Sequence, residues 1–144
     1  MNTRRELYVP PEGPPSEGRP NPEIFAKMGQ DNIFLMIEDL YLNLEKSKIR
    51  SIFPEDMIEA SKKSAAFFVF LLGGPPLYQQ RHGPPMMRQR HMPFVIDEEA
   101  RLEWIRCFDM VLENPKKYQF PEEYLTEFRR FLDRFSRWMV NTKT

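Results

Sequence analysis

The sequence predicts an all-α domain, and three features of its pattern support this prediction. Apolar residues recur at a spacing of three or four over long stretches, as they do on the buried face of an amphipathic helix. No stretch shows the sustained alternation of apolar and polar residues that marks a half-buried strand. Proline and glycine clusters separate the periodic stretches, and 144 residues suffice for one domain with a hydrophobic core.

The composition excludes several classes of protein. Lys+Arg and Asp+Glu both number 21, and this zero net charge gives no support for a nucleic-acid binder. The single cysteine, Cys107, excludes an internal disulfide framework and indicates a reducing compartment. The longest apolar run, residues 65–72, is eight residues long, far short of the ~20 that span a bilayer. Because the N-terminus also lacks an apolar signal core, we expect no membrane association and a cytoplasmic protein.

Residues 1–22 differ in composition from the rest of the chain. They contain six of the fourteen prolines, with glycine and glutamate between them. Such a segment cannot form a helix and buries little apolar surface. We therefore predict a Pro-rich, extended and mobile N-terminal arm at residues 1–22, followed by the helical domain at residues 23–144.

The first helical segment begins near Glu23 and is interrupted at Gly29. A short helix is expected over residues 22–28, and a longer one from residue 30 or 31 to about residue 44. A short turn follows before Pro54. The longer helix carries an apolar stripe at a spacing of three to four residues, formed by Ile33, Ile37, Leu40, Tyr41 and Leu44.

The next helix is predicted over residues 54–72. Proline and two acidic residues in the first turn are typical of a helix start. The side chains on its inner face are small near the beginning of the helix and large near the end. The small ones either admit a close helix or leave room for a ligand. This face consists of Met57, Ala60, Ser64, Phe67, Phe68 and Leu71.

The connection over residues 73–96 is long, and connections of this length in compact domains are usually functional. Two glycines and two prolines at residues 73–76 end the preceding helix, and we expect a loop from there to Pro85. Residues 86–91 are expected to form one or two helical turns. Two amphipathic helices follow, one capped by Asp97 and ended near Pro115, the other opened by Pro121.

His91 is the candidate that most needs an explanation. A haem site requires a neutral imidazole as axial ligand, apolar side chains on the porphyrin faces and cations for the propionates. On the residues alone, the alternative is a surface or capping histidine. The other histidine, His82, lies in a Gly/Pro loop and is expected to be exposed. The neighbours of His91 match the haem requirement and are Met87, Arg88, Arg90, Met92 and Phe94.

Two aromatic residues with polar tips allow two interpretations each. Tyr41 lies on an apolar helix face and is either a core tyrosine or a hydrogen-bond donor that points into a ligand cavity. Trp104 is either a core tryptophan or a donor that favours an anion or polarised dioxygen through its indole N–H.

A long and specifically spaced pattern connects these residues. It comprises Gly73-Gly74-Pro75, Tyr78, Gly83, Pro85, Arg88 and Arg90-His91-Met92-Pro93-Phe94. Upstream it includes Leu40-Tyr41 and Phe53-Pro54-Glu55-Asp56, and downstream Trp104-Ile105-Arg106-Cys107. In these residues, and over roughly residues 23–140, the sequence resembles the group II truncated haemoglobins.

The resemblance implies a shortened globin, which is a two-over-two helical sandwich around haem b. It implies that His91 is the proximal iron ligand and that Tyr41 and Trp104 are the distal donors. Phe53 would pack against the distal side of the haem. We also expect a second set of residues to bind the cofactor or lock the loop, namely Ala60, Ser64, Phe67, Leu71, Tyr78, Met87, Arg88, Arg90 and Phe94.

The sequence departs from the family pattern at three positions. Leu72 stands before the double glycine, where this group often has tryptophan. The common Gly-His-Pro is Gly83-Pro84-Pro85 here. His82 lies before the glycine and so cannot replace the missing histidine. Ala60 is apolar and offers no distal hydrogen bond, whereas Ser64 is a weak extra donor. The arm at residues 1–22 lies outside the pattern.

The leading hypothesis is a haem protein that binds dioxygen and other diatomic ligands at a five-coordinate iron. Two donors in a pocket of low dielectric constant predict slow dioxygen release. Slow release suits nitric-oxide or peroxide chemistry better than dioxygen delivery, and such an activity would need an unidentified reductase. The oligomer would be a monomer or a homodimer.

Two alternatives come from other classes of protein. The first is a haem-based gas sensor that acts through a separate partner, since the chain carries no output domain. The second is a cofactor-free helical interaction module, in which the apolar stripes form only core and the Pro-rich arm recruits a partner.

Overall fold

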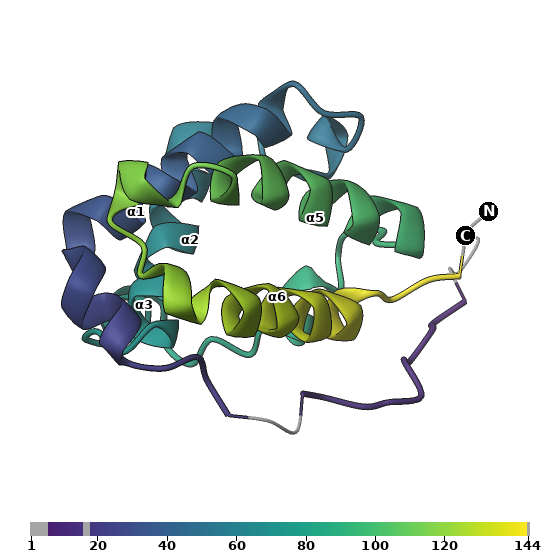
Figure 1. Cartoon of the computed structure of the whole chain (residues 1–144). Helices are drawn as coiled ribbons and strands as arrows, with labels where there is room; N and C mark the ends of the chain where they lie inside the picture. The colour runs from purple at the N-terminus through teal and green to yellow at the C-terminus, as the bar shows by residue number, and fades with distance from the viewer. Residues whose placement is uncertain (1–5, 16–17, 144) are drawn as a thin grey trace.

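The computed structural model describes residues 6–15 and 18–143, and every regular element in these ranges is helical. The all-α prediction is therefore confirmed. Four long helices form the frame, namely α1 (Glu23–Glu45), α2 (Met57–Leu71), α5 (Glu98–Leu112) and α6 (Leu125–Met139) (Figure 1). The shorter elements are α3 (Leu77–His82), α4 (Met87–His91) and 3-10 turns at Arg50–Ile52, Pro115–Tyr118 and Glu122–Tyr124.

The helix boundaries agree closely with the predicted signals. Gly29 interrupts α1 with φ 76° and ψ 166°, a conformation that glycine adopts without steric cost. Asp97 caps α5 as predicted, because its carboxylate accepts the Ala100 N–H at 2.8 Å. The start of α2 lies slightly later than predicted, since Asp56 is its cap and accepts the Glu59 N–H at 3.0 Å.

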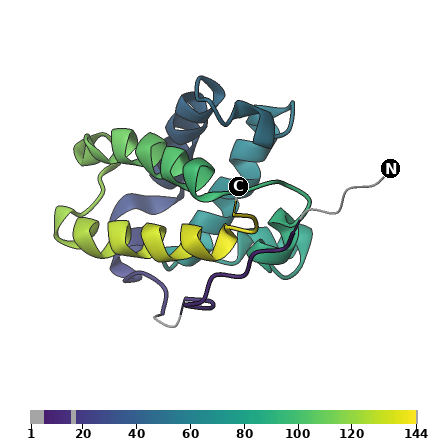
Figure 2. The ribbon, with the colours of Figure 1, turned by 90° about the vertical axis from the view of Figure 1, so that its right-hand side faces the viewer.

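The four long helices pack as two pairs, which is the two-over-two arrangement. Figures 1 and 2 show α5 and α6 side by side in one layer, with α1 and α2 in the other. Aromatic rings from three helices meet between the layers. Phe108 of α5 lies 5.6 Å from Phe68 of α2 and 5.7 Å from Phe128 of α6, measured between ring centroids. The first pair is tilted and the second edge-to-face, and rings at these separations add mutual attraction to the hydrophobic burial.

The segment between α2 and α5 departs from the prediction at one place. We expected a loop up to Pro85, but Leu77–His82 forms the helix α3. The two prolines at positions 75 and 76 precede this helix, where missing N–H groups cost nothing, so they open it and do not prevent it. Tyr78 supplies the burial that stabilises so short a helix, and Gly83, with φ 77°, ends it.

The described parts of the arm, residues 6–15 and 18–22, run alongside α6 (Figures 1 and 2). The Tyr8 N–H donates to the Asn141 carbonyl at 3.0 Å, near the C-terminus. The Asn21 N–H donates to the Glu127 carboxylate at 2.7 Å, at the start of α6. Residues 1–5 and 16–17 belong to the predicted arm but lie outside the described residues.

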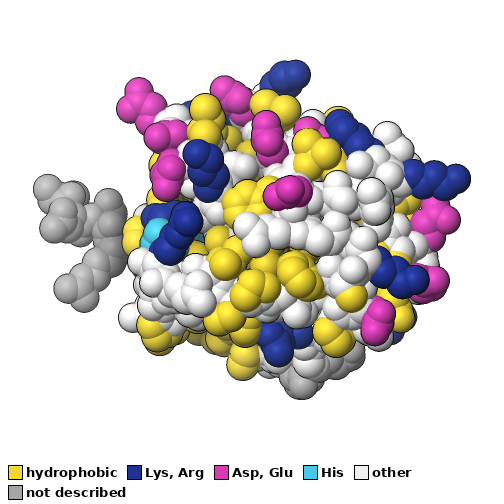
Figure 3. Space-filling model, turned by 90° about the vertical axis from the view of Figure 1, so that its left-hand side faces the viewer, with side chains coloured by type: hydrophobic (Ala, Val, Ile, Leu, Met, Phe, Trp, Pro, Cys, Tyr) yellow, Lys and Arg dark blue, Asp and Glu magenta, His cyan; other side chains and the backbone are white. Residues whose placement is uncertain are grey.

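The surface agrees with the balanced composition. On the face drawn in Figure 3, acidic and basic side chains are interspersed, and hydrophobic side chains gather near the centre. Within the described ranges, no helix is both long and apolar enough to cross a bilayer.

Candidate functional site

Tyr41, Phe53 and Ser64 come together from three separate segments. Tyr41 lies on α1, and its ring meets that of Phe53 edge-on, with centroids 5.7 Å apart. A hydrogen bond with Ser64 of α2 lowers the pKa of the Tyr41 phenol, but burial has the larger effect and raises the pKa overall. The phenol is therefore protonated at neutral pH and keeps an O–H to donate.

The inner face of α2 continues from this group toward the core. Ala60 is half-buried one turn before Ser64. Phe67 and Leu71 are buried further along the helix. The Phe67 ring lies 5.9 Å from Tyr78 of α3 and 5.9 Å from Phe135 of α6, so it joins α2 to both. The predicted change from small to large side chains therefore follows the path of α2 from the Tyr41 group into the aromatic core.

Trp104 stands on α5 and is half-buried. Its ring meets Phe108 edge-on at 5.4 Å, and Phe108 is fully buried. This packing fixes the plane of the indole against the aromatic core. That Trp104 and Tyr41 donate to one common ligand remains a prediction.

His91 forms the last residue of α4 and is half-buried. Its Nδ1 lies 2.6 Å from the Met87 carbonyl oxygen. A carbonyl only accepts, so Nδ1 carries the proton and Nε2 keeps its lone pair. Burial is the main influence and lowers the pKa of His91, which favours the neutral imidazole. A neutral ring with one oriented N–H and one free lone pair fits an iron ligand.

Phe94 and Met87 both lie close to the His91 ring. The Phe94 ring centroid lies 6.4 Å from the imidazole centroid, and this side chain is 39% exposed. Met87 is half-buried and supplies the carbonyl that orients the imidazole. That the partly exposed ring of Phe94 covers one face of a planar cofactor remains a prediction.

Arg90 locks the loop that leads into α4. Its Nη2 donates to the carbonyls of His82 and Pro84, both at 2.7 Å. Its guanidinium also lies over the buried Tyr78 ring, 5.2 Å from the centroid. Of the two expected roles for Arg90, these contacts support locking of the loop. His82 is half-buried, not exposed as expected, because its ring packs 4.9 Å from that of Tyr78.

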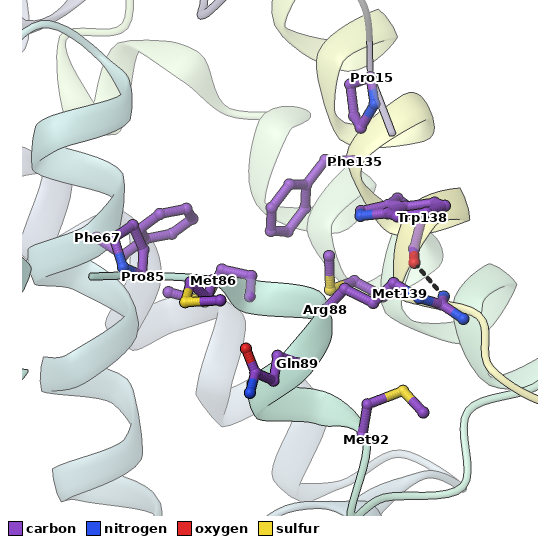
Figure 4. Close-up of a pocket in the computed structure, with 11 residues that line it drawn as sticks. Pro15, Phe67, Pro85, Met86, Arg88, Gln89, Met92, Phe135, Trp138 and Met139 are labelled. Carbon is purple, nitrogen blue, oxygen red and sulfur yellow. Dashed lines mark hydrogen bonds between the residues drawn. The ribbon is translucent and has the colours of Figure 1, made fainter. Parts of the chain in front are cut away.

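Arg88 connects α4 to both ends of the described chain. Nη1 donates to the carbonyls of Trp138 and Val140 at 2.6 and 2.7 Å, and Nη2 donates to the Tyr8 carbonyl at 2.8 Å. The guanidinium also stacks over the Trp138 ring at 4.7 Å (Figure 4). Three carbonyl partners direct this guanidinium to the chain ends, and a contact with a propionate remains a prediction.

A cavity of about 570 Å³ lies between α4 and α6, beside this arginine (Figure 4). Pro15 of the arm contributes to its rim. Neither Tyr41 nor His91 is among its lining residues, so it lies apart from the Tyr41 group. Most of the lining is apolar and includes Phe67, Met87, Met92, Phe135, Trp138 and Met139.

Sequence reasoning missed Asn141 completely. This residue follows α6, is fully buried and bonds the segment just after His91. Its Nδ2 donates to the carbonyls of His91 and Phe94 at 3.2 and 2.9 Å, and its Oδ1 accepts the Ile96 N–H at 3.0 Å. A lone asparagine near a C-terminus carries no periodic signal, so only the three-dimensional contacts reveal it.

Comparison with known proteins agrees with this architecture. The family model described as "Bacterial-like globin" matches residues 23–141. The group 2 truncated hemoglobin YjbI of Bacillus subtilis (strain 168) is 32% identical over 91 residues, which cover 62% of this chain and 69% of that protein.

Two solved structures show the same fold. Phosphate-bound Hell's gate globin IV has a TM-score of 0.82 and 35% identity, covering 90% of this chain and 81% of that one. The truncated oxygen-avid haemoglobin of Bacillus subtilis has a TM-score of 0.74 and 30% identity, covering 84% and 99%. The chain therefore belongs to the bacterial-like globin family, as a group II truncated haemoglobin whose cofactor is haem with iron.

Proposed function

We propose that His91 is the proximal iron ligand and that Tyr41 and Trp104 are the distal donors to a diatomic ligand. The observation that carries the proximal assignment is the orientation of the His91 ring. Its Nδ1–H is engaged by the Met87 carbonyl at 2.6 Å, and its pKa is lowered by burial. Both leave Nε2 unprotonated, as ligation of iron requires.

Haem supplies an iron that binds diatomic gases and exchanges one electron. The chain contributes hydrogen-bond donors where the ligand acquires negative charge. Tyr41 keeps its phenolic proton because burial raises its pKa. A donor in a pocket shielded from water stabilises negative charge more than it would in water. We infer that dioxygen leaves this protein slowly.

Slow release favours redox chemistry with nitric oxide or peroxide over dioxygen delivery. The Bacillus subtilis relative is named oxygen-avid, which supports a tight distal site here as well. When bound, haem iron would supply the one electron that nitric oxide and dioxygen need to combine to nitrate, and a reductase would have to restore that electron before the next turnover.

The remaining predicted site residues are assigned to the walls of the slot. Residues 23–144 are proposed as the globin domain, with residues 1–22 as an arm outside it. Tyr78, Arg88 and Arg90 hold the segment that carries His91, as their contacts support. The distal and lateral walls are assigned to Phe53, Ala60, Ser64, Phe67, Leu71, Met87 and Phe94.

A single-turnover experiment tests this function. Oxygen-loaded protein is mixed with nitric oxide, and nitrate and the oxidation state of the iron are followed. We expect nitrate in an amount equimolar to haem, and ferric protein as the other product. Release of dioxygen before any nitrate forms would contradict the proposed redox function, while leaving haem binding itself unaffected.

A further inference from the structure

The helix that carries His91 cannot hold its own position. α4 spans only Met87–His91, and none of its five residues is buried. An isolated helix this short is unstable in water, because nucleation costs more than a few hydrogen bonds return. The orientation of His91 must therefore be fixed by contacts from other parts of the chain.

Asn141 supplies such contacts from beyond the end of α6. Its two Nδ2 hydrogens donate to the carbonyls of His91 and Phe94, and its Oδ1 accepts the Ile96 N–H. The Asn141 N–H donates to the Ile96 carbonyl at 2.9 Å. The last carbonyls of a helix lack partners within it, and that of His91 accepts both the Phe94 N–H, at 3.0 Å, and Asn141. One buried side chain thus ties three points of residues 91–96 to the end of α6.

The arm joins the same group of contacts. The Tyr8 N–H donates to the Asn141 carbonyl, and the Tyr8 carbonyl accepts from Arg88. Arg88 also bonds the carbonyls of Trp138 and Val140. Tyr8, Arg88 and Asn141 therefore form a closed set of contacts around α4, which we call the terminal clamp. It joins both ends of the described chain to the helix that presents His91.

We propose that Asn141 is a positioning residue for the iron ligand, and that the arm acts on His91 through it. The proposal rests on the proposed role of His91. Asn141 acts on the imidazole through the backbone carbonyl of His91, and Met87 sets the ring from the other end of α4. Loss of the Asn141 donors frees the end of α4, and the imidazole then samples more than one orientation toward iron.

The test uses the full-length haem-loaded protein and two variants of Asn141. Asn141→Asp keeps the shape of the side chain and an acceptor for the Ile96 N–H, but removes both donors. Asn141→Ala removes the whole amide. Tyr118→Phe is the matched control, because it deletes a partly buried hydrogen bond of 2.6 Å to Asp39 that is not part of the clamp.

Two readouts separate positioning from general destabilisation. The first is the iron–histidine stretching band of the ferrous unliganded protein, measured by resonance Raman spectroscopy. The second is the rate at which haem transfers to an excess of an acceptor apoprotein. In both Asn141 variants we expect a shifted or split band and haem loss about fivefold faster, the factor that matches loss of the single bond to the His91 carbonyl at typical net strength. Tyr118→Phe is expected to keep the wild-type band.

A second variant keeps the proposal testable if the Asn141 variants do not fold. Tyr8→Pro deletes the N–H that donates to Asn141 together with the ring that faces Lys143, on a segment outside the helical core, and Tyr8→Ala, which loses only the ring, is its control. A smaller shift of the same band in Tyr8→Pro supports the proposal, and an unchanged band there would then overturn it.

Two results contradict the proposal when the Asn141 variants fold. The first is a band and a haem-loss rate equal to those of the wild type in both. The second is an equal change in Tyr118→Phe. A wild-type protein without any iron–histidine band would instead overturn the assignment of His91 and this proposal together, so the two failures are distinguishable.

Discussion

The two sides of the proposed haem slot are built in different ways. On the distal side, Tyr41, Ser64 and Trp104 stand on helices of 23, 15 and 15 residues, the first of them interrupted at Gly29. On the proximal side, His91 ends a helix of five residues without a buried member. That helix is held by side chains far away in sequence, since Asn141 bonds the carbonyl of a residue 50 positions away.

This difference determines how each side responds to a single substitution. A long amphipathic helix is positioned by many apolar contacts, so loss of one polar group leaves its path unchanged. A five-residue helix held by a few hydrogen bonds loses its position when one bond is removed. We therefore expect distal substitutions to change ligand kinetics, and proximal ones to change haem retention and stability. The predictions below test this division, beginning with the largest effect.

Removal of the proximal imidazole has the largest expected effect. His91→Ala deletes the proposed axial ligand, and we expect protein with little stably bound haem, measured as Soret absorbance per protein. His82→Ala is the matched control, since that ring packs on Tyr78, and it should retain haem. Normal haem content in His91→Ala would refute the proximal assignment.

Loss of the Arg88 guanidinium should lower the free energy of unfolding. Arg88→Met removes three donations to carbonyls, at a cost of roughly 2–4 kcal/mol in denaturant unfolding. Arg88→Lys keeps the charge without the planar fork and should recover only part of this loss. On the distal side, Ser64→Ala should cost less than about 1 kcal/mol. Equal costs for Arg88→Met and Ser64→Ala would show that the two sides are not held differently.

Substitution of Trp104 should change the kinetics of ligand dissociation and leave the packing of the helices unchanged. Trp104→Phe keeps the aromatic contact with Phe108 and removes the indole N–H. Dioxygen should dissociate faster by a factor that corresponds to about 0.5–1.5 kcal/mol, the net strength of a neutral hydrogen bond. Flash photolysis and stopped-flow mixing measure this rate. An unchanged rate would remove Trp104 from the set of donors.

The smallest expected effect is a pH dependence of the stability that ion pairs of α5 contribute to the fold. A hydrogen bond from Arg101 holds the pKa of Glu98 below its ordinary value of 4.5. A depressed pKa stabilises the fold above pH 4.5, and this contribution is lost as the pH falls through the lower folded value. Glu98 is largely exposed, so the loss should be only about 0.5 kcal/mol.

The measurement compares thermal unfolding of the wild type and Glu98→Gln across this acid range. The difference in unfolding temperature between the wild type and Glu98→Gln should disappear as the pH drops. Both proteins should keep the same haem spectrum at neutral pH. If the unfolding temperatures of the two proteins differ by the same amount at all pH values, the Glu98–Arg101 ion pair is not the source of the pH dependence.

The long helices could be predicted from the sequence because their signals are local. Asp97, Gly29 and the stripe that includes Tyr41 act within one or two helical turns. The small face at Ala60 and Ser64 also appears in the spacing itself, whereas the distal roles of Tyr41 and Trp104 came from the resemblance to a family and remain predictions. Composition at the Pro-rich arm also indicated an extended path.

The proximal side could be predicted only in part. His91 and its short helix carry local signals, and the resemblance to a family gave them a role. α3 was missed because the prolines that open it also resemble a loop signal. The terminal clamp was missed because Tyr8, Arg88 and Asn141 are brought together only by the complete fold. Hydrogen bonds that span 50 or more residues leave no pattern in a single sequence.

The dioxygen dissociation rate of Tyr41→Phe, compared with the wild type, tests the central claim most directly. The substitution removes one hydroxyl and keeps the ring that packs on Phe53. If Tyr41 stabilises the ligand in a pocket shielded from water, dissociation should accelerate by an amount worth roughly 1–3 kcal/mol, which is a factor of about 5 to 150. A rate equal to that of the wild type would contradict a distal site built around Tyr41.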